Sequence, residues 1–435
     1  MDKIIKARGA FLAMAVGEAR GAPLSGLTQG EIEAEGGVPE GLADPRLFQA
    51  KVHARRIQRG AYEDETQAAL CVADVLLREK RMNPDSLCSR FADLAQPVPG
   101  HLFGCWRRPH RNFRVAVRLM MNGTPWQECA QPSAGMGAAS RGVPLALYFA
   151  EDAQLAEACI LAGIVTHNDP RALAAVAAVA GLVRGAMNTT SEDLDEDALL
   201  EDVLRLVRCT EALMRDRYAA QLSENASGCT TQMGDAIEHV ATLLNEPLSA
   251  AFAAIVERSA PFGARAITSV GGGFAIAAVP ALIYLLLTDH DEFTDALDGV
   301  LAEGGATDTF GCLGGAFLGA LHGAGSIPRD WTKHLPNIQQ LEMRAATLVG
   351  APPGIMTPLI VLEAQVTKPV KSDAAKNTAR RFRGKLGHRS RTQARNAKAK
   401  RGFRSHPRRD DRGQDYGPGA GSGPGGGDSG PQNYS

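Results

Sequence analysis

The chain has 435 residues, of which 44% are hydrophobic, so it is long enough to bury a large core and exceeds the size of one average domain. This composition excludes a chain that is disordered throughout. Aromatic residues make up only 5%, and glycine is abundant with 47 residues, which suits closely packed helices better than a β-sandwich or β-barrel rich in Val, Tyr and Thr. We therefore expect an all-α body.

Charge is distributed unevenly, although the formal net charge is only -1. Residues 368–412 contain 17 Lys and Arg and 3 Asp, a net charge of about +14, so the rest of the chain carries about -15. The body is therefore acidic, and the C-terminal tail is basic.

Neither the cysteines nor the apolar segments indicate secretion or a membrane. The eight cysteines include no C-x-x-C pair and no histidine at zinc-ligand spacing, so we expect reduced thiols and a cytoplasmic protein. Gly17, Glu18 and Arg20 interrupt the apolar patch near the N-terminus, which argues against a signal peptide. The most apolar segment, residues 274–287, is too short to span a bilayer and contains Pro280. We expect it to be a buried core helix and predict no membrane anchor.

Apolar residues recur at helical spacing in six long windows, which Gly, Pro and Asn separate. The windows are residues 67–78, 153–164, 171–187, 196–222, 233–256 and 310–322. No segment clearly indicates a β-strand. Asp169 and Pro170 have the pattern of an N-cap and a first-turn proline for the helix over residues 171–187, whose small residues would allow close approach to neighbouring helices.

An acidic loop precedes the first of these windows. In GAYEDETQAAL, residues 60–70, three acids (Glu63, Asp64, Glu65) stand side by side before Thr66 and an apolar run. Carboxylate and hydroxyl oxygens are hard ligands that suit Mg²⁺, Mn²⁺ or Ca²⁺. A single acidic triplet is more often only a favourable charge at a helix N-terminus. The metal interpretation therefore needs a second cluster.

A second cluster lies far along the chain. In residues 303–323, Asp308 and Thr309 stand immediately before a predicted helix, and the surrounding glycines permit a tight turn and close approach of the backbone to a ligand. Two loops of acids and hydroxyls at helix starts could converge on shared cations.

The pattern of apolar residues ends near residue 367. Residues 367–435 are first basic and then rich in Gly and Pro, so they cannot bury enough surface to offset the entropy cost of ordering, and we predict a disordered tail. Its basic part, residues 368–412, is interpreted as an arm that binds nucleic acid or another polyanion, with Phe382 and Phe403 interspersed. The alternative is a tail that only adds solubility.

Five segments carry a likeness to a known family. They are RGAFLAMAVGEARGAP (8–23), GAYEDETQAAL (60–70), GMGAASRGVPLAL (135–147), AGIVTHNDPRALAAVAAVAGLV (162–183) and GGATDTFGCLGGAFLGALHGAGSIPRDW (304–331), and residues 269–293 add to them. In content and order they resemble the ADP-ribosylglycohydrolase family. The resemblance implies a compact orthogonal bundle of helices that holds two adjacent Mg²⁺ ions, which position ADP-ribose for cleavage of its bond to a protein side chain.

The resemblance assigns roles to the two acidic loops. Asp64 and Glu65 match the acids of the family's T-D-D-T loop, and Asp308 with Thr309 matches the end of its D-x-D-T loop. We therefore predict one or two Mg²⁺ or Mn²⁺ ions, with Glu63, Asp64, Glu65, Asp308 and Thr309 as ligands. Asp64 and Glu65 are also predicted to be catalytic, because a carboxylate near a cation can attack the anomeric carbon or activate attack on it.

The resemblance also assigns substrate contacts. Gly135 and Gly137 fall where the family contacts the nucleotide, and Thr166 and His167 match its T-H pair. We predict that Gly135, Gly137 and Thr166 bind substrate, and we interpret His167 as a residue that structures its loop. Arg141 could face the phosphates or make a surface ion pair.

Several positions depart from the family pattern: Glu63 replaces Thr, Glu65 replaces Asp, Ala306 replaces an acid, Glu18 replaces Asp, Ser25 replaces Glu and Met136 replaces Asn. About four acids remain where the family offers about five to two ions, which is ample for one cation and marginal for two. Without any cation, these acids would repel one another. We favour a rearranged site with a single metal.

The predicted function is metal-dependent removal of ADP-ribose from a modified protein side chain, with an arginine-type linkage favoured. The partner would be an ADP-ribosylated protein or ADP-ribose. One alternative is a catalytically impaired member that binds these ligands without cleavage, which the loss of acids at Ser25 and Ala306 favours. Another is a structural or nucleic-acid-binding protein whose activity lies in the tail. We place the enzyme-like domain at residues 1–350 and a connection at residues 351–366.

Overall fold

The computed structural model describes residues 1–44, 59–98, 101 and 103–367. These residues form 17 α-helices and no β-strand, so the predicted all-α class is confirmed. The helices are α1 (Lys3–Gly21), α2 (Gln29–Ala34), α3 (Asp64–Glu79), α4 (Pro84–Leu94), α5 (Arg111–Met121), α6 (Gly142–Tyr148), α7 (Asp152–Ile164), α8 (Pro170–Asn188), α9 (Glu196–Arg217), α10 (Gln232–Ala241), α11 (Leu248–Ser259), α12 (Ala275–Thr288), α13 (Phe293–Ala302), α14 (Thr307–His322), α15 (Arg329–Thr332), α16 (Ile338–Leu348) and α17 (Leu359–Val366). Apart from Thr367, the predicted disordered tail and its polyanion-binding arm lie outside the described residues.

Each of the six predicted windows is helical over most of its length. The predicted start of α8 is confirmed, because the Asp169 side chain accepts the backbone N–H of Arg171 and Pro170 is the first helical residue. The window 233–256 divides into α10 and α11. Pro247 is the N-cap residue of α11, and because its ring restricts the residue before it, one continuous helix could not run through this position.

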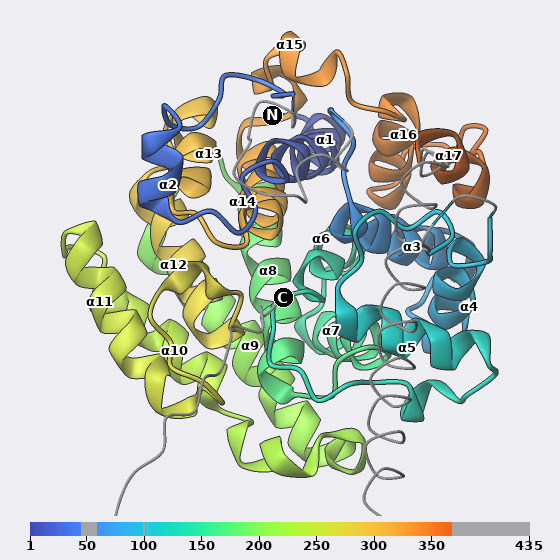
Figure 1. Ribbon diagram of the computed structural model, residues 1–435, viewed down its shortest axis with the longest axis horizontal. Helices are drawn as coiled ribbons and strands as arrows, with labels where there is room; N and C mark the ends of the chain where they lie inside the picture. Colours follow the sequence, from blue (N-terminus) through green and yellow to red (C-terminus); the bar gives the residue numbers. More distant parts are fainter. Residues whose placement is uncertain (45–58, 99–100, 102, 368–435) are drawn as a thin grey trace, which may run out of the picture. The chain divides into compact units, whose positions relative to one another are not determined.

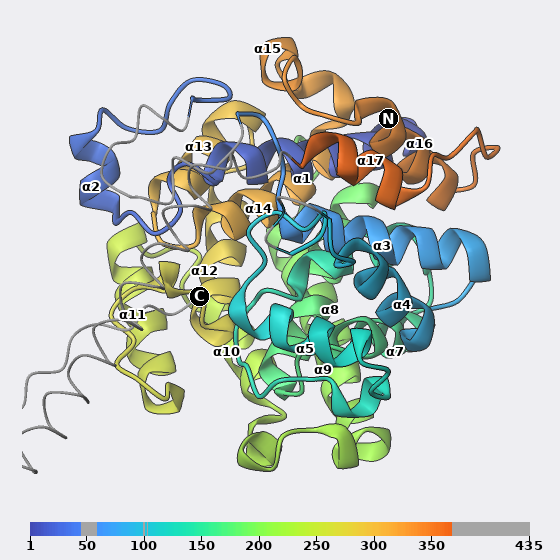
Figure 2. The same cartoon turned by 45° about the vertical axis from the view of Figure 1, so that its right-hand side comes forward.

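Helices α1 and α14 lie side by side in both views of the molecule (Figures 1 and 2). Small residues recur every four positions on each of them, at Gly9, Ala13, Gly17 and Gly21 in α1 and at Gly311, Gly315 and Gly319 in α14. The helices are antiparallel, so that Gly17 faces Gly311, and a Cβ atom at either position would collide with the backbone of the other helix. Glycine permits this approach because it has no Cβ atom. At the end of this row of small residues, the Thr307 hydroxyl donates to the Gly21 carbonyl oxygen at 2.7 Å, so the end of α1 meets the start of α14.

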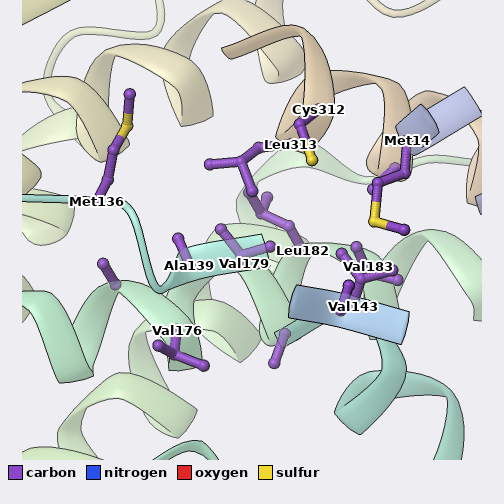
Figure 3. Packing of buried hydrophobic residues seen from close by; sticks show 14 of the residues in the cluster. Met14, Met136, Ala139, Val143, Val176, Val179, Leu182, Val183, Cys312 and Leu313 are labelled. Atoms are coloured by element: carbon purple, nitrogen blue, oxygen red, sulfur yellow. The ribbon is translucent and has the colours of Figure 1, made fainter. Parts of the chain in front are cut away.

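Helix α8 packs against both α14 and α6 within the hydrophobic core. Figure 3 shows Val179 and Leu182 of α8 beside Leu313 of α14, and Val183 of α8 beside Val143 of α6. All five side chains are buried. The core therefore links the α1/α14 pair to the helices that follow the acidic loop.

Two helices are strongly apolar. Among the described residues, α8 is the one helix whose length and composition would suffice to cross a membrane, but 83% of its apolar window is buried inside the structure. The segment predicted as a core helix is α12, which contains Pro280 and is buried from Ala275 to Leu287. Packing within the structure therefore accounts for the apolar surface of both helices.

Arg141 occupies a position that the sequence did not predict. It is fully buried, its Nη1 donates to the Ala162 carbonyl oxygen at 2.7 Å, and its guanidinium carbon lies 5.0 Å from the centre of the Phe91 ring. Burial lowers the pKa of Arg141 to about 10. The interpretation as a surface ion pair is wrong, because the flat guanidinium stacks on an aromatic ring of the core instead.

The last described helix, α17, lies within the segment predicted to be a connection, and the boundary at residue 350 stays a prediction. Glu363 of α17 is fully buried. Its carboxylate accepts hydrogen bonds from the Tyr62 hydroxyl at 2.7 Å, from Gln67 Nε2 at 2.7 Å and from Arg107 Nη1 at 2.6 Å. Glu363 therefore joins α17 to the start of α3 and to the loop before α5.

Candidate metal and ADP-ribose site

The acidic triplet lies at the start of α3. Glu63 is the N-cap residue, and Asp64 and Glu65 lie in the first turn. Their side chains are buried, with 3%, 7% and 2% of their respective surfaces exposed. Acids that only interact favourably with the dipole at a helix N-terminus can remain exposed to water. Burial of a charged group, by contrast, is costly unless the group has a partner. The burial of three acids together therefore favours a ligand site over the simpler N-terminal charge.

The second acidic loop meets the first. Asp308 and Thr309 occupy the first turn of α14, and both are buried. The Thr309 hydroxyl donates to Glu65 Oε1 at 2.8 Å, although 244 positions separate the two residues. The predicted convergence of the two loops is therefore confirmed.

Glu18 of α1 is a third contributor to the cluster. It is fully buried, and its carboxylate accepts the backbone N–H of Glu65 at 3.0 Å and that of Thr66 at 3.1 Å. These donors are among those that a helix N-terminus leaves without a partner. Burial and, next, the charge of Glu65 raise the pKa of Glu18 well above its usual range. From the sequence Glu18 received no site role, although an acid inside an apolar helix was a usable signal.

We expect Glu18→Ala to lower the free energy of unfolding by about 2 kcal/mol, because two buried N–H groups lose their acceptor. The exposed Glu33→Ala variant in α2 should leave stability unchanged within about 0.5 kcal/mol. Urea denaturation of both variants measures the difference. Equal stability of the two would contradict the role given to Glu18.

Two basic side chains enter the cluster from the loop before α5. Arg108 Nη1 lies 2.5 Å from Glu63 Oε2, and Arg108 Nη2 lies 3.8 Å from Asp308 Oδ2. His110 Nε2 lies 3.3 Å from Glu65 Oε1. Neither residue was predicted from the sequence. The signal was RRPHR at residues 107–111, a basic run within an acidic body.

Burial is the largest single influence on the pKa of the three acids at the start of α3 and of His110, although other groups together outweigh it at His110 and Glu65. It raises the pKa of Glu63 to about 8 against the opposing effect of Arg108, and it raises the pKa of Asp64 well above its usual range, with a further rise from Glu65. For His110, burial lowers the pKa, but Asp64 and Glu65 outweigh it and raise the value to about 10. For Glu65, burial raises the pKa, but hydrogen bonds, first that of His110, hold it well below its usual range. An added positive charge would favour the ionised acids.

Asp64, Glu65 and His110 fit a divalent cation. One ligand atom from each lies within 4.8 Å of the other two. Glu65 Oε2 is buried and has no hydrogen-bond partner among the described residues. A buried carboxylate oxygen without a partner is costly, and a cation would satisfy it. His110 was absent from the predicted ligand set, whose members Glu63, Asp308 and Thr309 lie in the same cluster but outside this group of three.

The predicted substrate contacts lie in different surroundings. A Cβ atom at Gly137 would lie 3.8 Å from His167 Nε2 and 3.9 Å from His110 Cδ2, so Gly137 borders the acidic cluster. Gly135 forms an isolated β-bridge with Phe274. Thr166 is fully buried, and its hydroxyl contacts the Gly163 carbonyl oxygen and His167 Nδ1. Of the three, only Gly137 lies beside a residue of the cluster, His110, and all three substrate roles stay predictions.

His167 is buried against Thr166, and its Nδ1 lies 2.8 Å from the Thr166 hydroxyl. Burial, followed by the charges of Arg141 and His110, lowers the pKa of His167 to about 3. A neutral imidazole held in this way agrees with the interpretation that His167 structures its loop.

Comparison with known families gives a match over most of the chain. The model of the family described as ADP-ribosylglycohydrolase matches residues 1–354. The chain belongs to the ADP-ribosylglycohydrolase family. Members of this family act on ADP-ribosylated substrates and typically depend on metal ions.

Curated relatives and a solved structure agree with this assignment. The ADP-ribosyl-[dinitrogen reductase] glycohydrolase of Rhodospirillum rubrum is 24% identical over 340 residues, which cover 78% of this chain and 93% of the relative. The ADP-ribosylhydrolase ARH3 of Danio rerio is 26% identical over 345 residues, which cover 72% and 85%. A solved chain of an ADP-ribosylglycohydrolase-related protein complex has a TM-score of 0.53 at 23% identity and covers 80% of this chain and 98% of its own. This last likeness supports the fold.

Two departures from the ADP-ribosylglycohydrolase pattern lie at the site itself. Ser25, where we expect Glu from the resemblance, donates its hydroxyl hydrogen to Asp308 Oδ2 at 2.9 Å. Ala306, where we expect an acid, is the N-cap residue of α14. Asp308 and the hydroxyl of Thr309 are therefore present at the site, but neither of the two additional carboxylates that the resemblance implies at Ser25 and Ala306.

Proposed function

We propose that the protein is a hydrolase that uses a divalent cation to cleave the N- or O-glycosidic bond between ADP-ribose and a protein side chain, with an arginine-type linkage favoured. The observation that carries the proposal is the Thr309–Glu65 hydrogen bond, which joins two distant acidic loops into one buried cluster. Family membership supplies the substrate class. The choice of arginine follows the sequence resemblance.

Asp64 and Glu65 differ in how their surroundings hold them. Glu65 Oε1 is fixed by Thr309 and His110, so Glu65 is suited to position a ligand. Asp64 accepts no hydrogen bond from the described residues and keeps 7% of its surface exposed, so its carboxylate is available to a substrate. A divalent cation bound here would orient ribose hydroxyls and stabilise negative charge. We assign Asp64 to the reacting bond, as nucleophile or general base, and Glu65 to positioning.

A second candidate function is binding of ADP-ribose, or of an ADP-ribosylated partner, without cleavage. The contact between Ser25 and Asp308 favours it, because a hydroxyl occupies the position of an expected carboxylate. A serine hydroxyl is far too weak a base to replace a carboxylate as a general base.

The test uses full-length protein treated with EDTA and two substrates, one ADP-ribosylated on arginine and one on serine. We expect release of ADP-ribose from the arginine substrate when Mn²⁺ or Mg²⁺ is restored, and a rate at least ~100-fold lower for Asp64→Asn. Binding of ADP-ribose without release from either substrate would instead establish the second candidate. Absence of both binding and release would contradict both.

A further inference from the structure

We propose that Arg108 takes the place of one of the two divalent cations expected in this family, so that the site holds a single cation beside Asp64, Glu65 and His110. The inference rests on the proposed function only in so far as the site binds a divalent cation. It concerns the number of cations and not the reaction.

Arg108 connects the same two loops that a shared cation would connect. Its guanidinium pairs with Glu63 from the loop before α3, at 2.5 Å, and faces Asp308 of α14, at 3.8 Å. The two carboxylates have only 4% and 6% of their side-chain surface exposed, so they need a positive partner. Arg108 supplies a permanent positive charge, because a guanidinium does not lose its proton in proteins.

The backbone around Arg108 is held in place by buried partners. The neighbouring Arg107 donates its backbone N–H to Gln67 Oε1 at 2.9 Å, its Nε to the Tyr62 carbonyl oxygen at 2.5 Å and its Nη1 to Glu363 at 2.6 Å. Arg108 itself has φ of 50°, in the left-handed region that non-glycine residues rarely adopt. Such a conformation persists only where the surroundings enforce it. The fold therefore directs the guanidinium of Arg108 at Glu63 and Asp308.

The other half of the cluster retains the properties of a cation site. Asp64 carries no hydrogen bond from the described residues, and Glu65 Oε2 is buried without a partner. His110 Nε2 lies 3.3 Å from Glu65 Oε1, and a cation bound here would displace the proton that this nitrogen shares with the carboxylate, so that both atoms could serve as ligands. An imidazole beside two carboxylates favours Mn²⁺ over Mg²⁺, because imidazole suits transition metals.

A second cation near Glu63 and Asp308 would have to displace Arg108 from both acids. It would otherwise lie against a guanidinium of like charge in a buried setting. Glu63 is then the partner of Arg108 and not a metal ligand, in contrast to its predicted role. Thr309 and Ser25 then position carboxylates through hydrogen bonds, to Glu65 and Asp308 respectively.

The test is a calorimetric titration of Mn²⁺ into EDTA-treated full-length protein, with a thermal unfolding curve for each sample. We expect one Mn²⁺ per chain for the wild type and for Arg108→Lys, which keeps the charge, and two for Arg108→Gln. Metal-free Arg108→Gln should unfold at a lower temperature than the wild type, and Mn²⁺ should restore most of the difference. Arg114→Gln, an exposed arginine on α5, is the matched control and should behave as the wild type.

A second pair of variants tests the inference even where Arg108→Gln does not fold. Glu65→Gln should raise the Mn²⁺ dissociation constant at least ~10-fold, whereas Glu63→Gln should change it less than ~3-fold, because Glu65 would contact the cation and Glu63 would contact Arg108. Two Mn²⁺ ions on the wild type, none on the wild type, or an equal loss of affinity in Glu63→Gln and Glu65→Gln would each overturn the inference. ADP-ribose release with two ions bound would leave the proposed function intact. One ion without release from any substrate would refute that function alone.

Discussion

Glu363→Ala is expected to lower the free energy of unfolding by about 3–5 kcal/mol, because it leaves the buried Arg107 guanidinium without its counter-ion. The same change removes the acceptor of the Tyr62 hydroxyl and of the Gln67 amide. Since Arg107 precedes Arg108, we also expect the Arg108 guanidinium to be held less firmly at Glu63 and Asp308. Metal-dependent ADP-ribose binding should be lost as a result. Urea denaturation of the full-length variant gives the stability change.

The control for this prediction is Glu257→Ala, an exposed glutamate on α11 that should shift stability by no more than about 0.5 kcal/mol. Glu363→Gln should fall between wild type and Glu363→Ala, because the amide keeps one acceptor oxygen but lacks the charge. A Glu363→Ala variant as stable as the control would show that α17 does not hold the loop before α5.

Gly311→Ala is expected to cost about 3 kcal/mol of folding free energy, because the added methyl group collides with the backbone of α1 at Gly17 and a backbone cannot rotate away as a side chain can. Separation of α1 from α14 would also move Glu18 away from the start of α3, so we expect ADP-ribose release to fall by more than the loss of folded protein explains. Thermal unfolding and the rate per folded molecule measure the two effects.

Gly30→Ala in α2 is the matched control, because no heavy atom lies within 4 Å of the position that its Cβ would take. It should leave stability unchanged or raise it by up to about 1 kcal/mol, since alanine favours helix over glycine. If Gly311→Ala were as stable as Gly30→Ala, the backbones of α1 and α14 would not be in close contact.

The helices were largely predictable from the sequence, because burial of one face imposes a period that the residues reveal. The segment 171–187 shows this best, since Asp169 and Pro170 also mark its start. Which helices pair was not predictable. The rows of small residues in α1 and α14 are visible in the sequence. Several other helices are also rich in small residues, so such a row does not identify the helix that packs against it.

The two acidic loops could be predicted because three acids and an Asp-Thr pair directly before helices are recognisable patterns, and a family resemblance supported them. The basic residues of the site, by contrast, could not be predicted from the sequence. Arg108 and His110 lie in a loop without periodicity, and their direction depends on Arg107 and its buried partner Glu363, which is 256 positions away. Glu18 was hidden for a related reason, because its role depends on where the start of α3 lies in space.

The most direct test of a shared site for the cation and ADP-ribose is a titration of ADP-ribose into metal-free full-length protein, with and without Mn²⁺, for the wild type and for Asp64→Asn. Mn²⁺ should strengthen ADP-ribose binding at least ~10-fold in the wild type, ADP-ribose should strengthen Mn²⁺ binding by the same factor, and Asp64→Asn should remove both effects. Equal affinity in EDTA and in Mn²⁺, or unchanged binding by Asp64→Asn, would contradict the claim that the two acidic loops form one site for cation and ADP-ribose.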